Sequence, residues 1–390
     1  MAGRSDGFDV DLLIADPGIG VIVCCGAGGV GKTTTAAAIA LRAAEAGRRV
    51  VVLTIDPARR LAQALGLGEL DNTPRPVQGI HTAGGGRLDA MMLDMKRTFD
   101  DVVIAHSPPD KAAQILANPF YQAVSSSFAG TQEYMAMEKL GQLRAQALRE
   151  HSWDLIVVDT PPSRSALDFL DAPSRLGSFL DGRFIRLLMA PARAGGRAGM
   201  RVFSVGIDLA TKTLSRVLGG QMLTDVQTFV AALDTMFGGF RERAEVTYAL
   251  LKEPTTAFVV VTSPERDAMR EAAYFVDRLA ADSMPLAGVV ANRVTVPIAA
   301  TLTGSRAAAA ADALADRADD NSEGTGSGPS LTVALLDLHT ELSAVAGRHA
   351  AAIERFRASH PRVGVRIVPA AATDIHDVAG LRSVGAALSA

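Results

Sequence analysis

The sequence predicts an α/β protein, with a mainly parallel sheet of seven or eight strands that is flanked by helices. Short runs of Val, Ile and Leu, bounded by turn residues, recur between longer stretches with helical patterning. Strands that are apolar on both faces are typical of parallel sheets covered by helices on each side. The runs that we expect to be strands are 21–25, 50–55, 88–93, 155–159, 258–262, 286–291 and 363–368.

Two long segments interrupt this alternation. Residues 98–150 and 172–250 have mostly helical patterning without a clear buried strand, so we expect helical insertions within a single domain, 1–390. Residues 307–330 run from poly-Ala into a Gly- and Ser-rich stretch, which predicts a flexible linker.

Composition and charge place the chain among ordinary soluble proteins. Hydrophobic residues make up 48% of the 390 residues, and the formal net charge of −3 gives no reason to expect nucleic-acid binding. The two cysteines, Cys24 and Cys25, are neighbours in an expected strand, so their side chains point to opposite faces and make no disulfide framework. The N-terminus lacks a signal pattern, and no run reaches about 18 apolar residues. We therefore expect a cytoplasmic protein.

Residues 26–33 read GAGGVGKT and match the pattern G-x-x-x-x-G-K-[ST] of a phosphate-binding P-loop. An expected strand leads into the motif and an Ala-rich helical run follows, as the motif requires. Its glycines let backbone N–H groups converge on an anion, and the helix adds its positive N-terminal end. Lys32 can reach the β- and γ-phosphates, and the Thr33 hydroxyl can bind Mg²⁺. The residues expected to contact the nucleotide here are Gly26, Ala27, Gly28, Gly29, Val30, Gly31, Lys32, Thr33 and Thr34.

Two aspartates follow or close expected strands. Asp56 comes directly after one strand and Asp159 ends another. Ligands of open α/β sheets bind at the carboxyl ends of the strands, so both side chains should face the same site as the P-loop. The alternative for each is the N-cap of a following helix, a position that aspartate favours.

The P-loop and the segments LTIDPARRLAQALG and VVDTPPSRSALDFL resemble the arsenical-pump and guided-entry targeting ATPases, a deviant-Walker-A family of the P-loop class. The segments GTQEYMAMEKL, VVANRV and IVPAAATDI also fit this family, in the same order along the chain. The resemblance extends from about residue 18 to 388 and is greatest to the mycobacterial-type, anion-transporting ATPases of actinobacteria. It implies a dimeric, Mg²⁺-dependent ATP hydrolase whose closure acts on a partner or client.

The resemblance also implies roles for individual residues. Lys32 and Asp56 would be catalytic, with Asp56 orienting or deprotonating the attacking water. Asp159 would hold Mg²⁺ through a water, together with Thr33. Asn292 would bind the purine edge and Pro369 would belong to the loop over the base. The alternatives are that Asn292 is only a turn residue and that Pro369 only marks the end of a strand.

One residue departs from the family pattern. In the deviant motif GKGGVGKT, the second position is a lysine that reaches the partner's phosphates across the dimer interface, and here it is Ala27. Such a charge matters for phosphoryl transfer. Turnover is then weak, or an arginine (Arg59, Arg60 or Arg164) replaces the lysine, or a partner subunit supplies it. We favour the last, a heterodimer with a paralogue that retains the lysine. An ATP-binding regulatory subunit and a partitioning-type ATPase are alternative functions.

Other family features are not expected in this chain. Arsenite activation needs several soft thiolates and the family's zinc needs paired CxxC motifs, so we expect neither ligand, and no metal besides Mg²⁺. The apolar stripe from Val226 to Phe240 has helical spacing and is either a packed helix face or a client groove. The arginine-rich residues 183–201 form either a solvated loop or a contact with a partner or a membrane surface.

Overall fold

The computed structural model describes residues 8–55, 60–81, 84–119, 121–122, 125, 131–161, 242–297, 299, 301–320 and 331–389. Eight strands form one sheet: β1 (Val21–Cys25), β2 (Arg49–Thr54), β3 (Arg75–Pro76), β4 (Arg87–Met92), β5 (Leu155–Asp159), β6 (Thr256–Thr262), β7 (Leu286–Val294) and β8 (Val365–Pro369). Their order is β3-β4-β2-β5-β1-β6-β7-β8. All neighbouring strands are parallel except β3 and β4. The expected parallel sheet of seven or eight strands is therefore confirmed.

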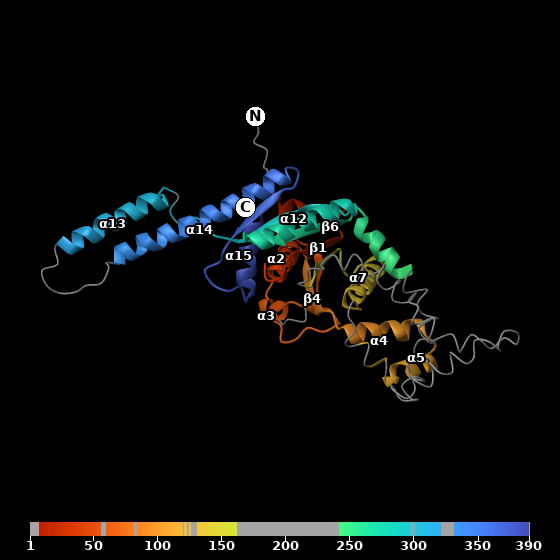
Figure 1. Ribbon diagram of the computed structural model, residues 1–390. Coiled ribbons are helices and arrows are strands. Elements are labelled where there is room, and N and C mark those ends of the chain that lie inside the picture. Colours follow the sequence, from red (N-terminus) through yellow and green to blue (C-terminus); the bar gives the residue numbers. More distant parts are fainter. Residues whose placement is uncertain are drawn as a thin grey trace, which may run out of the picture.

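Helices cover both faces of this sheet (Figure 1). They are α1 (Val10–Ala15), α2 (Lys32–Glu45), α3 (Arg60–Ala64), α4 (Met95–His106), α5 (Pro109–Leu116), α7 (Thr131–Glu150), α12 (Arg266–Ala281), α13 (Gly304–Asp320), α14 (Leu331–Ser359) and α15 (Val378–Ser389). None of the helices in the described part of the chain is long and apolar enough to cross a bilayer.

Strand β1 shows why both faces need cover. Val21, Val23 and Cys25 belong to one apolar core, and Ile22 and Cys24 belong to the other. The first core also contains side chains of α4, α7, α12 and the C-terminal part of α14, whereas the second contains those of α1, α2, α3 and α15. Successive residues of a strand point to opposite faces, so a strand with no polar residue must be covered on both. The two cysteines lie on opposite faces for the same reason.

The helical insertions are only partly within the described residues. Over 98–150 the described residues form α4, α5 and α7, with no strand among them. Of 172–250 the structure describes only the last nine residues, which are helical, and both the 226–240 stripe and residues 183–201 lie outside the described part. A partly buried ion pair links this helix to α7, because Arg243 Nε lies 3.0 Å from both carboxylate oxygens of the buried Glu138.

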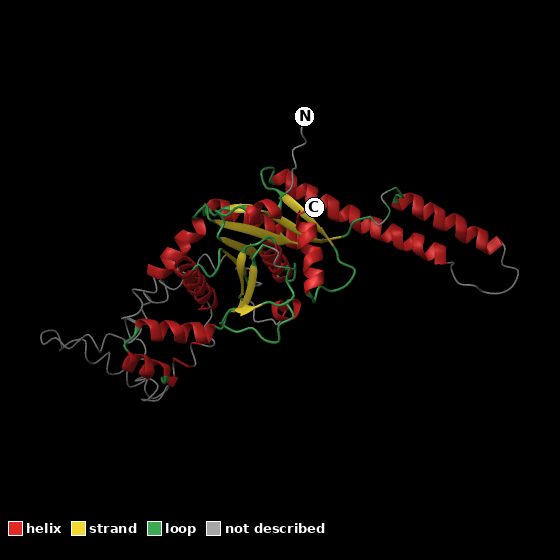
Figure 2. Ribbon diagram, turned by 180° about the vertical axis from the view of Figure 1, so that it is seen from behind, coloured by secondary structure: helices red, strands yellow, loops and turns green. Residues whose placement is uncertain are grey.

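The prediction of a flexible linker over 307–330 is wrong for residues 307–320. Residues 304–320 form α13, which packs against α14 as a helical hairpin that projects from the body of the molecule (Figures 1 and 2). Alanine has the highest helix propensity of all residues, so a poly-Ala run that can bury one face on a neighbour folds as a helix. Residues 321–330 lie outside the described part.

Candidate functional site

The P-loop connects β1 to α2, and glycine is required at both of its ends. Gly26 has φ 146°, and a Cβ there would lie 2.0 Å from the Val261 carbonyl oxygen of β6. Gly31 has φ 95°, and a Cβ there would lie 2.3 Å from Asn292 Nδ2 of β7. Larger residues would push the loop away from both strands, and the left-handed backbone would be strained as well. The neighbouring strands therefore fix the curvature of the loop.

Two loop side chains carry the polar chemistry of this site. The buried Lys32 ammonium donates a hydrogen bond to the Ala27 carbonyl oxygen, with Nζ and O 2.7 Å apart. Thr33 Oγ1 donates to Asp159 Oδ2 over 2.7 Å. A cation and a hydroxyl therefore stand at the start of α2, where the helix dipole also favours an anion.

Asp159 ends β5, next to β1, and its side chain is fully buried. Besides Thr33, the hydroxyl of Thr54 donates to the same carboxylate oxygen, with Thr54 Oγ1 2.9 Å from Oδ2. Thr54 is the last residue of β2, and sequence reasoning missed it because a threonine inside a strand is common. Hydroxyl and carboxylate oxygens are the ligands that Mg²⁺ prefers, so this set fits the ion.

The two cysteines beside this site have raised pKa values and low reactivity. Burial raises the pKa of the Cys24 thiol well above its usual range, and the neighbouring Asp159 charge raises it further. Burial also raises the pKa of Cys25 to about 12, although the positive charge of Lys32 opposes this shift. Because only the thiolate is a good nucleophile and metal ligand, neither cysteine is activated.

Two side chains from the end of β7 hold the outer side of the P-loop. Asn292 Nδ2 donates to the Val30 carbonyl oxygen over 2.9 Å, and Arg293 Nη1 donates to the Gly29 carbonyl oxygen, also over 2.9 Å. Adjacent strand residues ordinarily point to opposite faces, but the β7–β8 register shifts between Ala291 and Val294, and Arg293 has φ 58°. This irregularity lets both side chains turn to the loop. The N–H and C=O of one peptide unit point in opposite directions, so bonds on the carbonyls favour N–H groups aimed inward.

The structure brings together the P-loop and Asp159, as expected from the sequence. The amide of Asn292 bonds to the Val30 carbonyl oxygen of the loop, a contact that the sequence did not predict, and its role at the purine edge stays a prediction. Ala27 is buried in the apolar core that contains α2. Pro369 is exposed at the end of β8, which is the third strand from β1 in the sheet. The backbone N–H of the next residue, Ala370, donates to the Val294 carbonyl oxygen of β7. The remaining expected residues lie outside the described part: Asp56, Arg59, Arg164 and the side chain of Arg60. Arg293 was not among the arginines that the sequence suggested, although it follows Asn292 directly.

A strand, a glycine loop with buried lysine, and a carboxylate at the next strand end indicate a nucleotide-binding P-loop, and comparison with known proteins agrees. The family model described as anion-transporting ATPase matches residues 19–301. This chain belongs to that family. The resemblance to the arsenical-pump and guided-entry ATPases is thereby confirmed.

Similar proteins come from three different organisms. The chain is 26% identical over 277 residues to the ATPase ASNA1 homolog of Cryptosporidium parvum, a match that covers 70% of this chain and 64% of that protein. It is 29% identical over 157 residues to ATPase GET3 of Malassezia globosa, covering 40% and 43%. It is 32% identical over 169 residues to Protein Rv2184c of Mycobacterium tuberculosis, covering 40% and 38%. The chain thus matches less than two thirds of the length of each of these three relatives.

Proposed function

We propose that the chain is a Mg²⁺-dependent ATP hydrolase that works as a nucleotide-driven dimeric switch. The observation that carries this proposal is the contact of the P-loop hydroxyl with the buried carboxylate, Thr33 Oγ1 to Asp159 Oδ2, beside Lys32. Two of the relatives named above are themselves called ATPases. Loops that contact the γ-phosphate, and release it after hydrolysis, are the physical basis of such switches.

Each residue has a distinct role in this proposal. Lys32 leaves the Ala27 carbonyl and binds the β- and γ-phosphates, while the inward N–H groups of the loop bind the remaining phosphate oxygens. Thr33 and Asp159 would hold Mg²⁺, which neutralises phosphate charge when bound. Asp56 orients the attacking water or accepts its proton. Asn292 adds a polar group where the purine would lie.

The test is steady-state phosphate release by the purified chain with ATP, with and without Mg²⁺. Lys32→Ala, which removes the charge at the phosphates, should abolish release at an unchanged fold. Asp159→Asn should do so too, and Asp56→Asn should lower release while ATP still binds. ATP binding without release in the wild-type chain would favour the alternative, a regulatory subunit. Failure to bind ATP at all would end both proposals.

Ala27 bears on the partner. A buried methyl group cannot supply the positive charge that a lysine at this position would carry across a dimer interface. We propose a heterodimer in which a paralogue with this lysine completes the site. Nucleotide-driven closure of that dimer would act on a client. Native mass measurement of the chain purified from its own cell would show a mixed dimer. A pure homodimer that hydrolyses ATP, with release unaffected by Ala27→Lys, would contradict it.

A further inference from the structure

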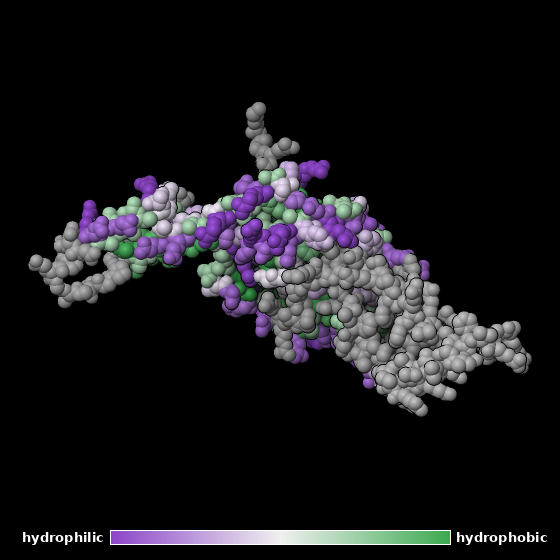
Figure 3. All heavy atoms as spheres, in the orientation of Figure 1, coloured by the Kyte–Doolittle hydropathy of each residue, from purple (hydrophilic) through white to green (hydrophobic). Residues whose placement is uncertain are grey.

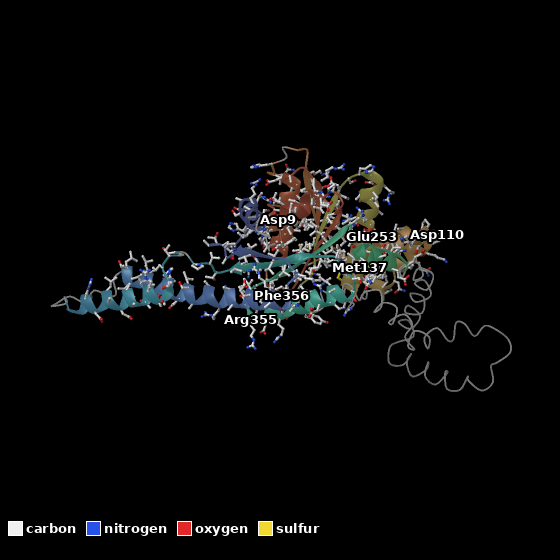
Figure 4. All side chains as sticks on the ribbon, turned by 90° about the horizontal axis from the view of Figure 1, so that it is seen from above. Asp9, Asp110, Met137, Glu253, Arg355 and Phe356 are labelled. Atoms are coloured by element: carbon white, nitrogen blue, oxygen red, sulfur yellow. The ribbon has the colours of Figure 1, made fainter. Side chains whose placement is uncertain are left out.

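Helices α13 and α14 form an arm with its own internal packing. Thr340 Oγ1 lies 3.3 Å from the Gly304 carbonyl oxygen and 2.9 Å from the Leu336 carbonyl oxygen, and His339 Nε2 lies 2.8 Å from the Leu302 carbonyl oxygen. At the other end, the C-terminal part of α14 packs against the sheet core through Phe356, which Figure 4 labels, whereas the neighbouring Arg355 is exposed. The N-terminal half of α14 extends beyond the body beside α13 (Figures 1 and 2).

One face of this extended half is apolar and exposed. The exposed fractions of Leu331, Leu335 and Leu338 are 76%, 56% and 49%. Leu342 and Val345 continue the series and are half-buried. The spacings of four, three, four and three residues repeat every seven, which is the pattern of the apolar seam of a coiled coil. Figure 3 shows hydrophobic side chains on the arm among hydrophilic ones. A row of leucines left in water at this spacing fits a partner helix.

The charge of the arm indicates the kind of helix. From Gly304, where the arm begins, to residue 342 the sequence has seven acidic residues and two arginines. Asp337 and Glu341 are exposed and lie, at about 100° per residue, on the side of the leucine row away from α13. Asp312 and Asp316 of α13 are exposed as well. Like charges oppose a second copy of this acidic arm and an anionic membrane surface, whereas Lys or Arg beside the partner's apolar seam would be attracted.

We propose that the arm is a docking surface for a basic amphipathic helix of a partner protein. The leucine row packs against the apolar seam of that helix, and Asp337 and Glu341 pair with its flanking basic residues. The arm begins at Gly304, just beyond the residues 19–301 that match the family model. The proposed docking surface therefore lies outside the matched residues, and the proposal does not depend on the proposed ATP hydrolysis.

The test uses the full chain and two fluorescein-labelled synthetic peptides of three heptads, both with Leu at the a and d positions. One has Lys at the e and g positions, and its matched partner has Glu there. Fluorescence anisotropy should show saturable binding of the Lys peptide, weakening with added NaCl, and at least tenfold weaker binding of the Glu peptide. Leu335→Ser with Leu338→Ser should weaken the Lys peptide by roughly tenfold or more.

Two controls separate the surface from general attraction. Leu12 is 73% exposed on α1, so Leu12→Ser tests a leucine of similar exposure elsewhere and should leave binding unchanged. Asp337→Lys with Glu341→Lys should reverse the preference toward the Glu peptide, whereas Asp267→Lys on α12 should not. Equal binding of both peptides, or equal loss in Leu12→Ser, overturns the proposal. The proposal is also overturned if the chain self-associates or binds phosphatidylserine vesicles and the double change Leu335→Ser with Leu338→Ser removes that association or binding.

Discussion

Replacing Asn292 by alanine separates two roles for this side chain, holding the P-loop and binding the adenine. Its amide donates to the Val30 carbonyl oxygen over 2.9 Å, inside the protein. Losing a partner from a buried hydrogen bond costs about 1–3 kcal/mol. If that bond keeps the loop N–H groups aimed inward, the loss appears in phosphate binding. The affinity for ATP should then fall roughly five- to 150-fold.

The assay is isothermal titration of the chain with ATP and, separately, with inorganic tripolyphosphate, which has no base. Holding of the loop predicts that Asn292→Ala weakens both ligands by the same factor. Arg293→Ala, which removes the exposed bond to Gly29, should weaken both by a smaller factor. If ATP binds more weakly but tripolyphosphate binds as before, Asn292 acts on the base alone. If neither affinity changes, the hydrogen bond from Asn292 to the loop does not contribute to phosphate binding, and the reasoning fails.

Three further changes test other contacts. Thr54→Val removes a hydroxyl from Asp159 Oδ2, and we expect about a tenfold higher Mg²⁺ requirement for phosphate release; Thr54→Ser should behave as wild type, and an equal defect in it would point to packing instead. Arg243→Leu leaves the buried Glu138 carboxylate without its cation, so urea unfolding should show a loss of about 3–5 kcal/mol. Adding Glu138→Leu should restore most of that loss, and no recovery would contradict the ion-pair explanation. Because burial raises the pKa of both cysteines, a disulfide reagent at neutral pH should modify neither in the folded chain and both in urea; fast native labelling would refute this.

The sheet could be predicted because its strands are apolar on both faces, as in 155–159, which has the expected bounds in the structure. Strand β7 continues past the expected 286–291 to Val294. The sequence did not predict this extension because Asn292 and Arg293 are polar and do not have the pattern of a buried strand. The two-residue β3, which is exposed and includes a proline, gave no signal at all. Patterns of burial thus predict central strands well and polar strand ends poorly.

The site was predictable where a short motif encodes it and hidden where distant strands meet. The spacing of Lys32 and Thr33 within the P-loop is local, so the sequence alone places them correctly. The bond of Asn292 to the loop depends on an irregularity in β7, 262 residues from its partner, and no local pattern reports that. The poly-Ala run was misread because low complexity suggests a linker, although its helix propensity favours α13. The position of Asp56 stays a prediction.

The long helix α14 has a mechanical consequence. Its His349 Nδ1 accepts a hydrogen bond from the Thr295 backbone N–H over 3.1 Å, two residues beyond the arginine that holds the P-loop. From this pivot about 18 residues of helix lead to Leu331, a distance of about 27 Å. A lever of that length turns a rotation of about 5° at the pivot into a displacement of about 2 Å at the tip. A small rotation at the end of β7 would therefore produce a larger displacement at the far end of the arm, because α14 is one continuous helix.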